Sequence, residues 1–158
     1  MATIPLTRRG AELLKDELHR LKTVERHAVI RAISEARAQG DLSENAEYEA
    51  AKDKQGFIEG RILEIESKLA AAQVIDPATV DAGGRVVFGA TVDLTDEESG
   101  DNVTYQIVGD DEADLKQGLI SISSPIARSM IGKEAGDVAE FKAPGGIKRY
   151  DIVEVRYR

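Results

Sequence analysis

Apolar residues recur at steps of three and four through the start of the chain. The first series comprises Ala11, Leu14, Leu18 and Leu21. The stretch from Ala11 to about Ala38 contains neither proline nor glycine, so the pattern predicts one long amphipathic helix. Thr7 is the expected N-cap, and Gly40 the expected left-handed residue beyond the C-terminus. Ile30, Ile33 and Ala36 depart from the first stripe, which predicts looser packing towards that end.

A second stretch keeps the alternation of three and four for longer. Its members are Tyr48, Ala51, Gln55, Ile58, Ile62, Ile65, Leu69 and Ala72. Such a seam requires a partner helix, and the nearest one is the first helix, because only a short turn separates the two. We therefore expect an antiparallel helical hairpin.

Two glycines interrupt the second helix. Gly56 and Gly60 each cost roughly 1 kcal/mol relative to alanine in a helix interior. Either another backbone approaches closely at this point, or both are tolerated surface positions, and the spacing does not decide between the two.

The hydrophobic period changes after Asp76-Pro77. Short β-branched runs bounded by turn residues predict strands, which pair most naturally in antiparallel fashion. These runs are 85–94, 103–108, 119–122, 138–142 and 147–157. Ser124 and Pro125 open one short helix that ends before Gly132. The expected fold class is α+β, with a coiled-coil hairpin over residues 1–77 and a small antiparallel β-sheet domain with one short helix over 78–158.

Composition narrows the functional classes. The 158 residues include no cysteine, which excludes disulfides and thiolate sites and fits a reducing cytoplasm. No apolar run is long enough to cross a bilayer, and the N-terminus does not have the order of a secretory signal, so we expect no membrane association. The net charge of −8 argues against bulk nucleic-acid binding. Residues 1–75 are nearly neutral, with 12 basic and 13 acidic side chains, so any nucleic-acid contact belongs there.

Enzyme signatures are missing from the sequence. It has no phosphate loop, dinucleotide-binding glycine fingerprint, nucleophile elbow or zinc-protease helix, and we expect no self-contained enzyme. His19 and His27 are eight residues apart on one helix, a spacing that separates them by two turns and does not suit a metal pair.

The turn between the two helices carries the most suggestive chemistry. Asp41 and Glu44 lie three residues apart at a helix start, which is the spacing of a capping box. In the rival arrangement Ser43 caps the helix, and both carboxylates face outward at the positive helix end. The second arrangement suits a hard cation such as Mg²⁺, although two carboxylates fill only part of its six-coordinate shell.

An incomplete metal site suggests that the remaining ligands come from elsewhere. Water, a substrate phosphate or another protein can provide them, and two metal ions about 4 Å apart can drive phosphodiester hydrolysis. Arg37 precedes the turn and Lys52 follows it by about two helical turns, so the two can hold a phosphate backbone, or else they are ordinary solvated charges.

Several motifs resemble the Gre family of bacterial transcript cleavage factors. They are Gly40-Asp41-Leu42-Ser43-Glu44-Asn45-Ala46-Glu47-Tyr48, Gln55-Gly56-Phe57-Ile58-Glu59-Gly60-Arg61-Ile62, Val87-Phe88-Gly89-Ala90, Val108-Gly109-Asp110-Asp111-Glu112-Ala113-Asp114 and the stretch from Ser124 to Glu134. The resemblance covers nearly the whole chain.

This resemblance implies a coiled coil that enters the secondary channel of RNA polymerase and an FKBP-like domain that docks on its rim. It implies that polymerase itself cleaves the protruding 3′ end of backtracked nascent RNA, stimulated by the tip. Asp41 and Glu44 match the family's acidic pair and would share Mg²⁺ with the polymerase, while Ser43 would orient water or RNA. Ser124 to Met130 and the flanking loops are candidates for the docking surface, and we expect a monomer.

The resemblance also bears on the length of the RNA product. Arg37 and Lys52 would contact RNA, and this limited basic surface is similar to the GreA branch, which implies short cleavage products. Lysine at position 52 cannot make the bidentate phosphate contact that an arginine would make, so the assignment of an RNA contact is weaker at this position than at Arg37.

Two other functions remain as alternatives. A Gre-like protein can occupy the polymerase channel and inhibit it, although the usual mark would be extra acidic residues at the tip. A prolyl isomerase or chaperone would need an aromatic-lined pocket. Its candidates after residue 80 are Phe88, Tyr105, Phe141, Tyr150 and Tyr157.

Overall fold

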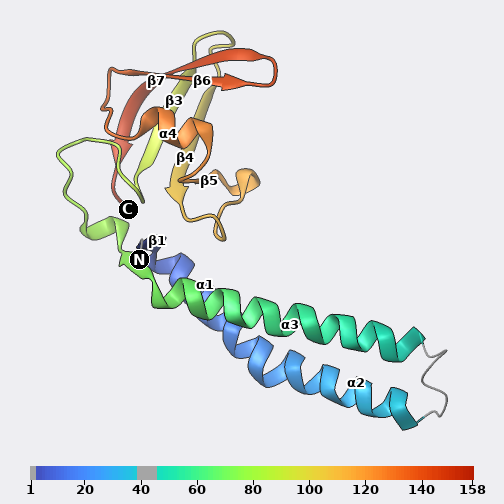
Figure 1. Cartoon of the computed structure of the whole chain (residues 1–158). Coiled ribbons are helices and arrows are strands. Elements are labelled where there is room, and N and C mark those ends of the chain that lie inside the picture. Colours follow the sequence, from blue (N-terminus) through green and yellow to red (C-terminus); the bar gives the residue numbers. More distant parts are fainter. Residues whose placement is uncertain (1–2, 39–45) are drawn as a thin grey trace. The chain divides into compact units, whose positions relative to one another are not determined.

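Two compact units make up the chain, as seen in a computed structural model that describes residues 3–38 and 46–158 (Figure 1). The first unit comprises Glu12–Ala72. The second comprises Thr3–Ala11 together with Gln73–Arg158. The turn residues Asp41, Ser43 and Glu44 lie outside the described residues.

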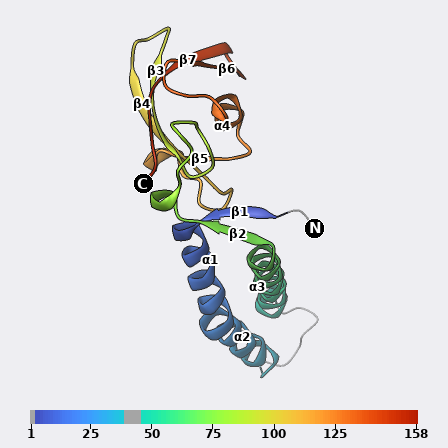
Figure 2. The same ribbon diagram turned by 90° about the vertical axis from the view of Figure 1, so that its left-hand side faces the viewer.

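The first unit is the predicted helical hairpin. The chain runs out along α1 (Arg8–Arg20), a π-helical turn η1 (Leu21–Glu25) and α2 (Arg26–Ala38), and it returns along α3 (Ala46–Ala70) beside them (Figures 1 and 2). One stripe from each arm is buried, and the residues are Leu14, Leu21, Val29 and Ala36 from the first and Ala51, Ile58, Ile62 and Ile65 from the second. The predicted pairing of the two seams is confirmed.

The π-helical turn explains why the first stripe changes phase. Leu14, Leu21, Val29 and Ala36 are separated by seven, eight and seven residues. Two α-helical turns take about seven residues, so a step of eight in a regular helix would rotate Val29 by about 80° away from the seam. The wider turn η1 absorbs the extra residue and returns both Val29 and Ala36 to the interface. The expectation that Ala36 leaves the stripe is therefore wrong, whereas Ile30 is 48% exposed.

The two glycines of α3 are surface positions. A Cβ atom added at Gly56 or Gly60 would have no other heavy atom within 4 Å in the described part of the chain. Of the two alternatives that the sequence leaves open, the structure supports tolerated surface glycines.

In the second unit a five-stranded sheet follows a small two-stranded one. The small sheet pairs β1 (Ile4–Thr7) with β2 (Ala72–Ile75), neither of which the pattern predicts. The 3-10 helix η3 (Pro77–Thr79) follows β2. The larger sheet has the order β5-β4-β3-β7-β6. Its strands are β3 (Thr91–Asp96), β4 (Asn102–Val108), β5 (Leu119–Ser121), β6 (Val138–Ala143) and β7 (Gly146–Arg156).

One pair of strands departs from the antiparallel arrangement. β5 runs parallel to β4, with Gln106 opposite Leu119 and Val108 opposite Ser121. The intervening segment, residues 109–118, includes the 3-10 helix η4 (Leu115–Gln117) and is long enough for the chain to return to the other end of β4.

The first predicted strand begins later than expected. Residues 85–90 are outside β3: Arg85 forms an isolated bridge with Glu134, while Gly89 and Ala90 hydrogen-bond to Ile107 of β4. Instead of entering the sheet, Val86 exchanges backbone hydrogen bonds with the segment after the short helix, donating to the Lys133 carbonyl at 2.7 Å and accepting from the Gly132 amide at 2.8 Å. A turn at Gly89, with φ of +88°, separates this segment from β3.

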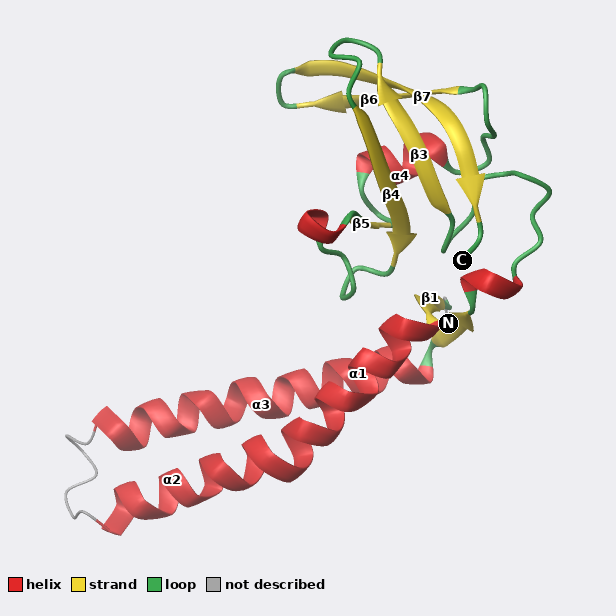
Figure 3. Ribbon diagram, turned by 180° about the vertical axis from the view of Figure 1, so that it is seen from behind, coloured by secondary structure: helices red, strands yellow, loops and turns green. Residues whose placement is uncertain are grey.

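The short helix α4 (Pro125–Met130) packs against one face of the curled sheet (Figure 3). The hydroxyl of Ser124 accepts a hydrogen bond from the Ala127 amide at 3.3 Å, which confirms the predicted cap. Ala127 and Met130 are fully buried in a core shared with strand residues such as Leu94 and Ile107. None of the helices within residues 3–38 and 46–158 combines the length and apolarity that a bilayer span requires.

Candidate functional site

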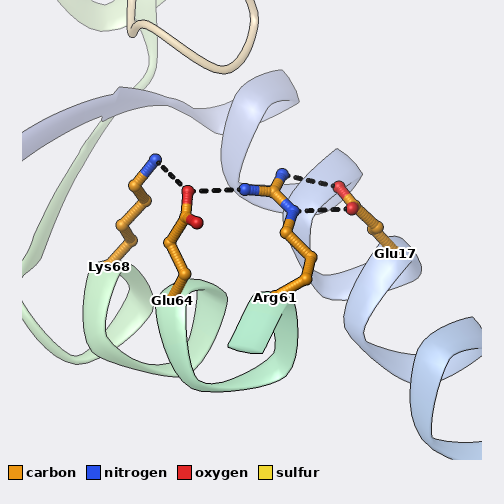
Figure 4. Close-up of polar contacts among 4 residues, drawn as sticks. All are labelled: Glu17, Arg61, Glu64 and Lys68. Atoms are coloured by element: carbon orange, nitrogen blue, oxygen red, sulfur yellow. Dashed lines mark hydrogen bonds and ion pairs between the residues drawn. The ribbon is translucent and has the colours of Figure 1, made fainter. Parts of the chain in front are cut away.

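The two arms of the hairpin are joined by ion pairs along its length. Arg61 of α3 donates two hydrogen bonds to Glu17 of α1, at 2.8 and 2.9 Å, and a third to Glu64 at 2.8 Å, while Lys68 lies 3.1 Å from the same Glu64 carboxylate (Figure 4). Side chains in a bidentate pair lose less rotational freedom per hydrogen bond than those in single contacts. This network fixes the two helices near the base of the hairpin.

A second bidentate pair lies further along. Arg26 of α2 donates to both oxygens of Glu59, at 2.9 and 2.8 Å, and Lys22 lies 3.0 Å from Glu66. The hydrogen bond from Arg26 lowers the pKa of the Glu59 carboxyl and raises that of the guanidinium. The pair therefore stays ionised at neutral pH, and it holds α2 against α3 between the base and the tip.

At the far end of the hairpin, the predicted basic residues have different partners. The guanidinium carbon of Arg37, in the last turn of α2, lies 5.8 Å from the centroid of the Tyr48 ring in the first turns of α3. Lys52 donates to the Gln55 side chain at 3.4 Å. Both cations are exposed, and neither has a carboxylate partner among the residues that the structure describes.

The predicted acidic pair cannot be placed. Asp41 and Glu44, with their neighbour Ser43, lie between the described ends of α2 and α3. Within residues 3–38 and 46–158, no group of three or more His, Cys, Asp or Glu side chains is arranged to hold a metal ion. His19 and His27 are both exposed. The magnesium site thus stays a prediction from sequence.

Tyr48 is the residue near the tip that sequence reasoning missed. Its place in the apolar seam gave it a packing role, and it is half-buried. The available signal was an aromatic residue and an arginine on opposite sides of one short turn, a placement that brings the two together when the helices run antiparallel.

The second unit contains an open groove beside α4. Its lining includes Pro5, Ile122, Ser123, Arg128 and Ile131, and its volume is about 460 Å³. The groove overlaps the stretch from Ser124 to Met130 that was predicted to dock a partner. Its described lining is mostly apolar and includes the cation of Arg128.

The aromatic residues of this unit serve the core. Tyr150 is buried within it and stacks on Phe141, with ring centroids 5.9 Å apart. Phe88, Tyr105 and Tyr157 pack against the same core. None of these rings lines the groove beside α4. In the described part of the chain, these five rings are therefore placed at the core and not along that groove.

Comparison with known proteins adds an independent result. Residues 4–74 match the family model "Transcription elongation factor, N-terminal", and residues 81–157 match "Transcription elongation factor, GreA/GreB, C-term". Transcription elongation factor GreA of Verminephrobacter eiseniae is 75% identical over the full length of both chains. GreA of Polaromonas naphthalenivorans is 73% identical over 99% of each. A solved structure of a GreA/GreB factor from Nitrosomonas europaea is 25% identical, covers 99% of this chain and 100% of its own, and has a TM-score of 0.43.

Proposed function

Because this chain belongs to the GreA/GreB family of transcription elongation factors, we propose that it binds backtracked RNA polymerase and stimulates the polymerase to cleave the nascent RNA. The hairpin enters the secondary channel, and the cut releases short fragments from the 3′ end. The observation that carries this proposal is a hairpin whose two arms are braced by two bidentate ion pairs, and in the sequence Asp41 and Glu44 lie between those arms. Such an element can deliver carboxylates into the catalytic centre of a partner.

Asp41 and Glu44 are the proposed ligands of a Mg²⁺ ion shared with the polymerase. Carboxylate oxygens are the donors that Mg²⁺ prefers, and two of them leave coordination positions for polymerase side chains, water and an RNA phosphate. When bound, the ion supplies an acidified water for attack on the phosphodiester bond. Ser43 precedes Glu44 directly and follows Asp41 by two positions in the sequence, and its proposed role is to orient water or RNA. The protein is thus a partner that completes an active site and not an enzyme by itself.

Arg37 and Lys52 hold the RNA in this account. Both are exposed at the same end of the hairpin, and positive side chains fix the register of a nucleic-acid backbone through its phosphates. Lys52 acts as a point charge, whereas Arg37 offers a planar fork of donors. The two contacts add little bulk affinity for nucleic acid, which agrees with the net charge of −8.

The groove beside α4 is the proposed docking site on the polymerase. A lining that combines the apolar side chains of Ile122 and Ile131 with the cation of Arg128 suits a partner surface that combines apolar and acidic side chains. In this account Arg128→Glu weakens polymerase binding, while cleavage at saturating protein is retained.

Cleavage of arrested complexes tests the function directly. Stalled polymerase carrying 3′-labelled backtracked RNA is incubated with and without the protein, and the released fragments are resolved by length. We expect wild-type protein to release short fragments, and Asp41→Asn and Glu44→Gln each to reduce the rate on the order of 100-fold. Glu47→Gln is the matched control, because Glu47 is an exposed carboxylate in the first turn of α3, and it should retain the wild-type rate.

Polymerase binding distinguishes the alternatives. Asp41→Asn and Glu44→Gln should each displace wild-type protein from polymerase at the same concentration at which unlabelled wild-type protein does so. A wild-type protein that binds polymerase, slows elongation and releases no RNA fragment would contradict the proposal and establish the channel inhibitor instead.

A further inference from the structure

Arg37 and Tyr48 meet across the end of the hairpin, one on each side of the acidic turn. The 5.8 Å between the guanidinium carbon and the ring centroid is within the range of a cation–π contact. We propose that Tyr48 is a positioning residue: its ring holds the guanidinium of Arg37 so that the N–H donors face the phosphate backbone of the RNA. This inference rests on the proposed function, because it assigns Tyr48 a part in the same site.

A guanidinium group can be restrained by an aromatic ring while its N–H donors stay available to bind a phosphate. A cation–π contact acts on the charge of the guanidinium as a whole, whereas a phosphate is bound through its N–H donors. The ring therefore restricts the side chain without occupying a donor. Among the residues that the structure describes, the contact with Tyr48 is the one interaction of the Arg37 side chain, and no hydrogen bond or ion pair of its guanidinium is found.

Two other arginines of the hairpin are held in a different way. Arg26 and Arg61 are each fixed by a bidentate carboxylate, Glu59 and Glu17 respectively. Those contacts use the donors that a phosphate would need and neutralise the charge. Arg37 is held by a neutral ring and keeps both its charge and its donors, which is the arrangement that a phosphate-binding residue requires.

The proposed role of Tyr48 depends on its ring. The side chain occupies a seam position that an apolar group can fill, so replacing it with leucine preserves packing while it removes the π face. Phenylalanine preserves both. These two substitutions separate the positioning role from a merely structural one.

The functional test is a double-mutant cycle on the maximal rate of RNA cleavage at saturating protein. We expect Tyr48→Leu to lower this rate about 2- to 5-fold, and Tyr48→Phe to retain it. Because Tyr48 acts through Arg37, the double variant Arg37→Gln/Tyr48→Leu should be no slower than Arg37→Gln alone. Losses that multiply, or a Tyr48→Phe variant as slow as Tyr48→Leu, would overturn the proposal.

Phe57→Leu is the matched control. Phe57 is an aromatic residue on the same helix, 78% exposed, and its replacement should leave the cleavage rate unchanged.

A second measurement examines the stack without any polymerase. In the NMR spectrum of the free protein, the ring current of Tyr48 should shift the side-chain protons of Arg37 upfield. The shift should persist in Tyr48→Phe and disappear in Tyr48→Leu. If the wild-type spectrum has no such shift, the positioning role is wrong even where cleavage is normal. If the shift is present but wild-type protein stimulates no cleavage, the stack stands and the proposed function fails, and with it the role of the stack in cleavage.

Discussion

A buried carboxylate fixes the first turn of α1. The Glu112 side chain is 4% exposed, accepts a hydrogen bond from the Thr7 hydroxyl and lies 3.0 Å from the Arg9 guanidinium. Thr7 in turn accepts a hydrogen bond from the Gly10 amide at 2.9 Å, which confirms it as the predicted N-cap. A Cβ atom at Gly10 would lie 2.7 Å from the Glu112 carboxylate, so the glycine in this helix has a steric reason.

Replacing Glu112 and replacing Arg9 should lower the free energy of unfolding by different amounts. Glu112→Ala should lower the free energy of unfolding by about 1–3 kcal/mol, because the buried Thr7 hydroxyl loses its acceptor and Arg9 loses its partner. Arg9→Ala should cost less than about 1 kcal/mol, because its side chain is 56% exposed and water replaces it. Urea unfolding of the full chain measures both, and equal losses for the two variants would contradict the assigned roles.

The sequence predicted the cap at Thr7 but not its partner. A cap depends on residues within one helical turn, so its signal is local. Glu112 is separated from Thr7 by 105 positions, and nothing in the local pattern connects them. The cation–π contact between Tyr48 and Arg37 was missed for a related reason, since a seam position has a sufficient explanation in packing.

The π-helical turn η1 keeps the buried residues before and after it in register with α3, and we call it a register adaptor for this role. It allows one helix to bury Leu21 and Val29, eight residues apart, on the same side. Within the turn the Thr23 hydroxyl donates to the His19 carbonyl at 2.7 Å. The step of eight is visible in the sequence, but a sequence shows only that the phase changes. Whether the helix bends, packs loosely or inserts a wider turn depends on the fixed heptads of α3 opposite.

Two single-residue deletions test this role. Val24 lies within η1 and is 56% exposed. Deleting it would space all the buried residues of the first arm seven positions apart. The arm should then form a regular α-helix, with an unchanged or higher melting temperature. Deleting Ala32 in α2 instead leaves Val29 and Ala36 six residues apart, and one of them must leave the seam at a cost of about 2 kcal/mol or more. Thermal unfolding followed by circular dichroism compares them. Equal destabilisation by both deletions would show that η1 is not a register adaptor.

The strands of the larger sheet were predicted from their apolar pattern, whereas the two strands of the small sheet were missed. Residues 103–108 and 147–157 correspond closely to β4 and β7. β1 and β2 have four residues each, and neither forms a recognisable period by itself. The parallel placement of β5 also depends on the path of residues 109–118 and not on the strand's own composition.

At the scale of the whole molecule, the family assignment and the physical features support one account. The chain matches GreA/GreB models over residues 4–74 and 81–157 and is 75% identical to a GreA over its full length. The hairpin has a braced body and an exposed basic end, and the acidic turn between its helices stays a prediction from sequence. The central claim is that Asp41 and Glu44 bring part of a magnesium site to the polymerase.

The Mg²⁺ dependence of RNA cleavage tests that claim most directly. Cleavage rates of arrested complexes are measured across a Mg²⁺ titration, without the protein and with saturating wild-type, Asp41→Asn or Glu44→Gln protein. We expect wild-type protein to lower the Mg²⁺ concentration for half-maximal cleavage, and we expect each variant to move that concentration back towards the value without protein. A midpoint that is the same with and without wild-type protein, or that neither variant changes, would contradict that claim.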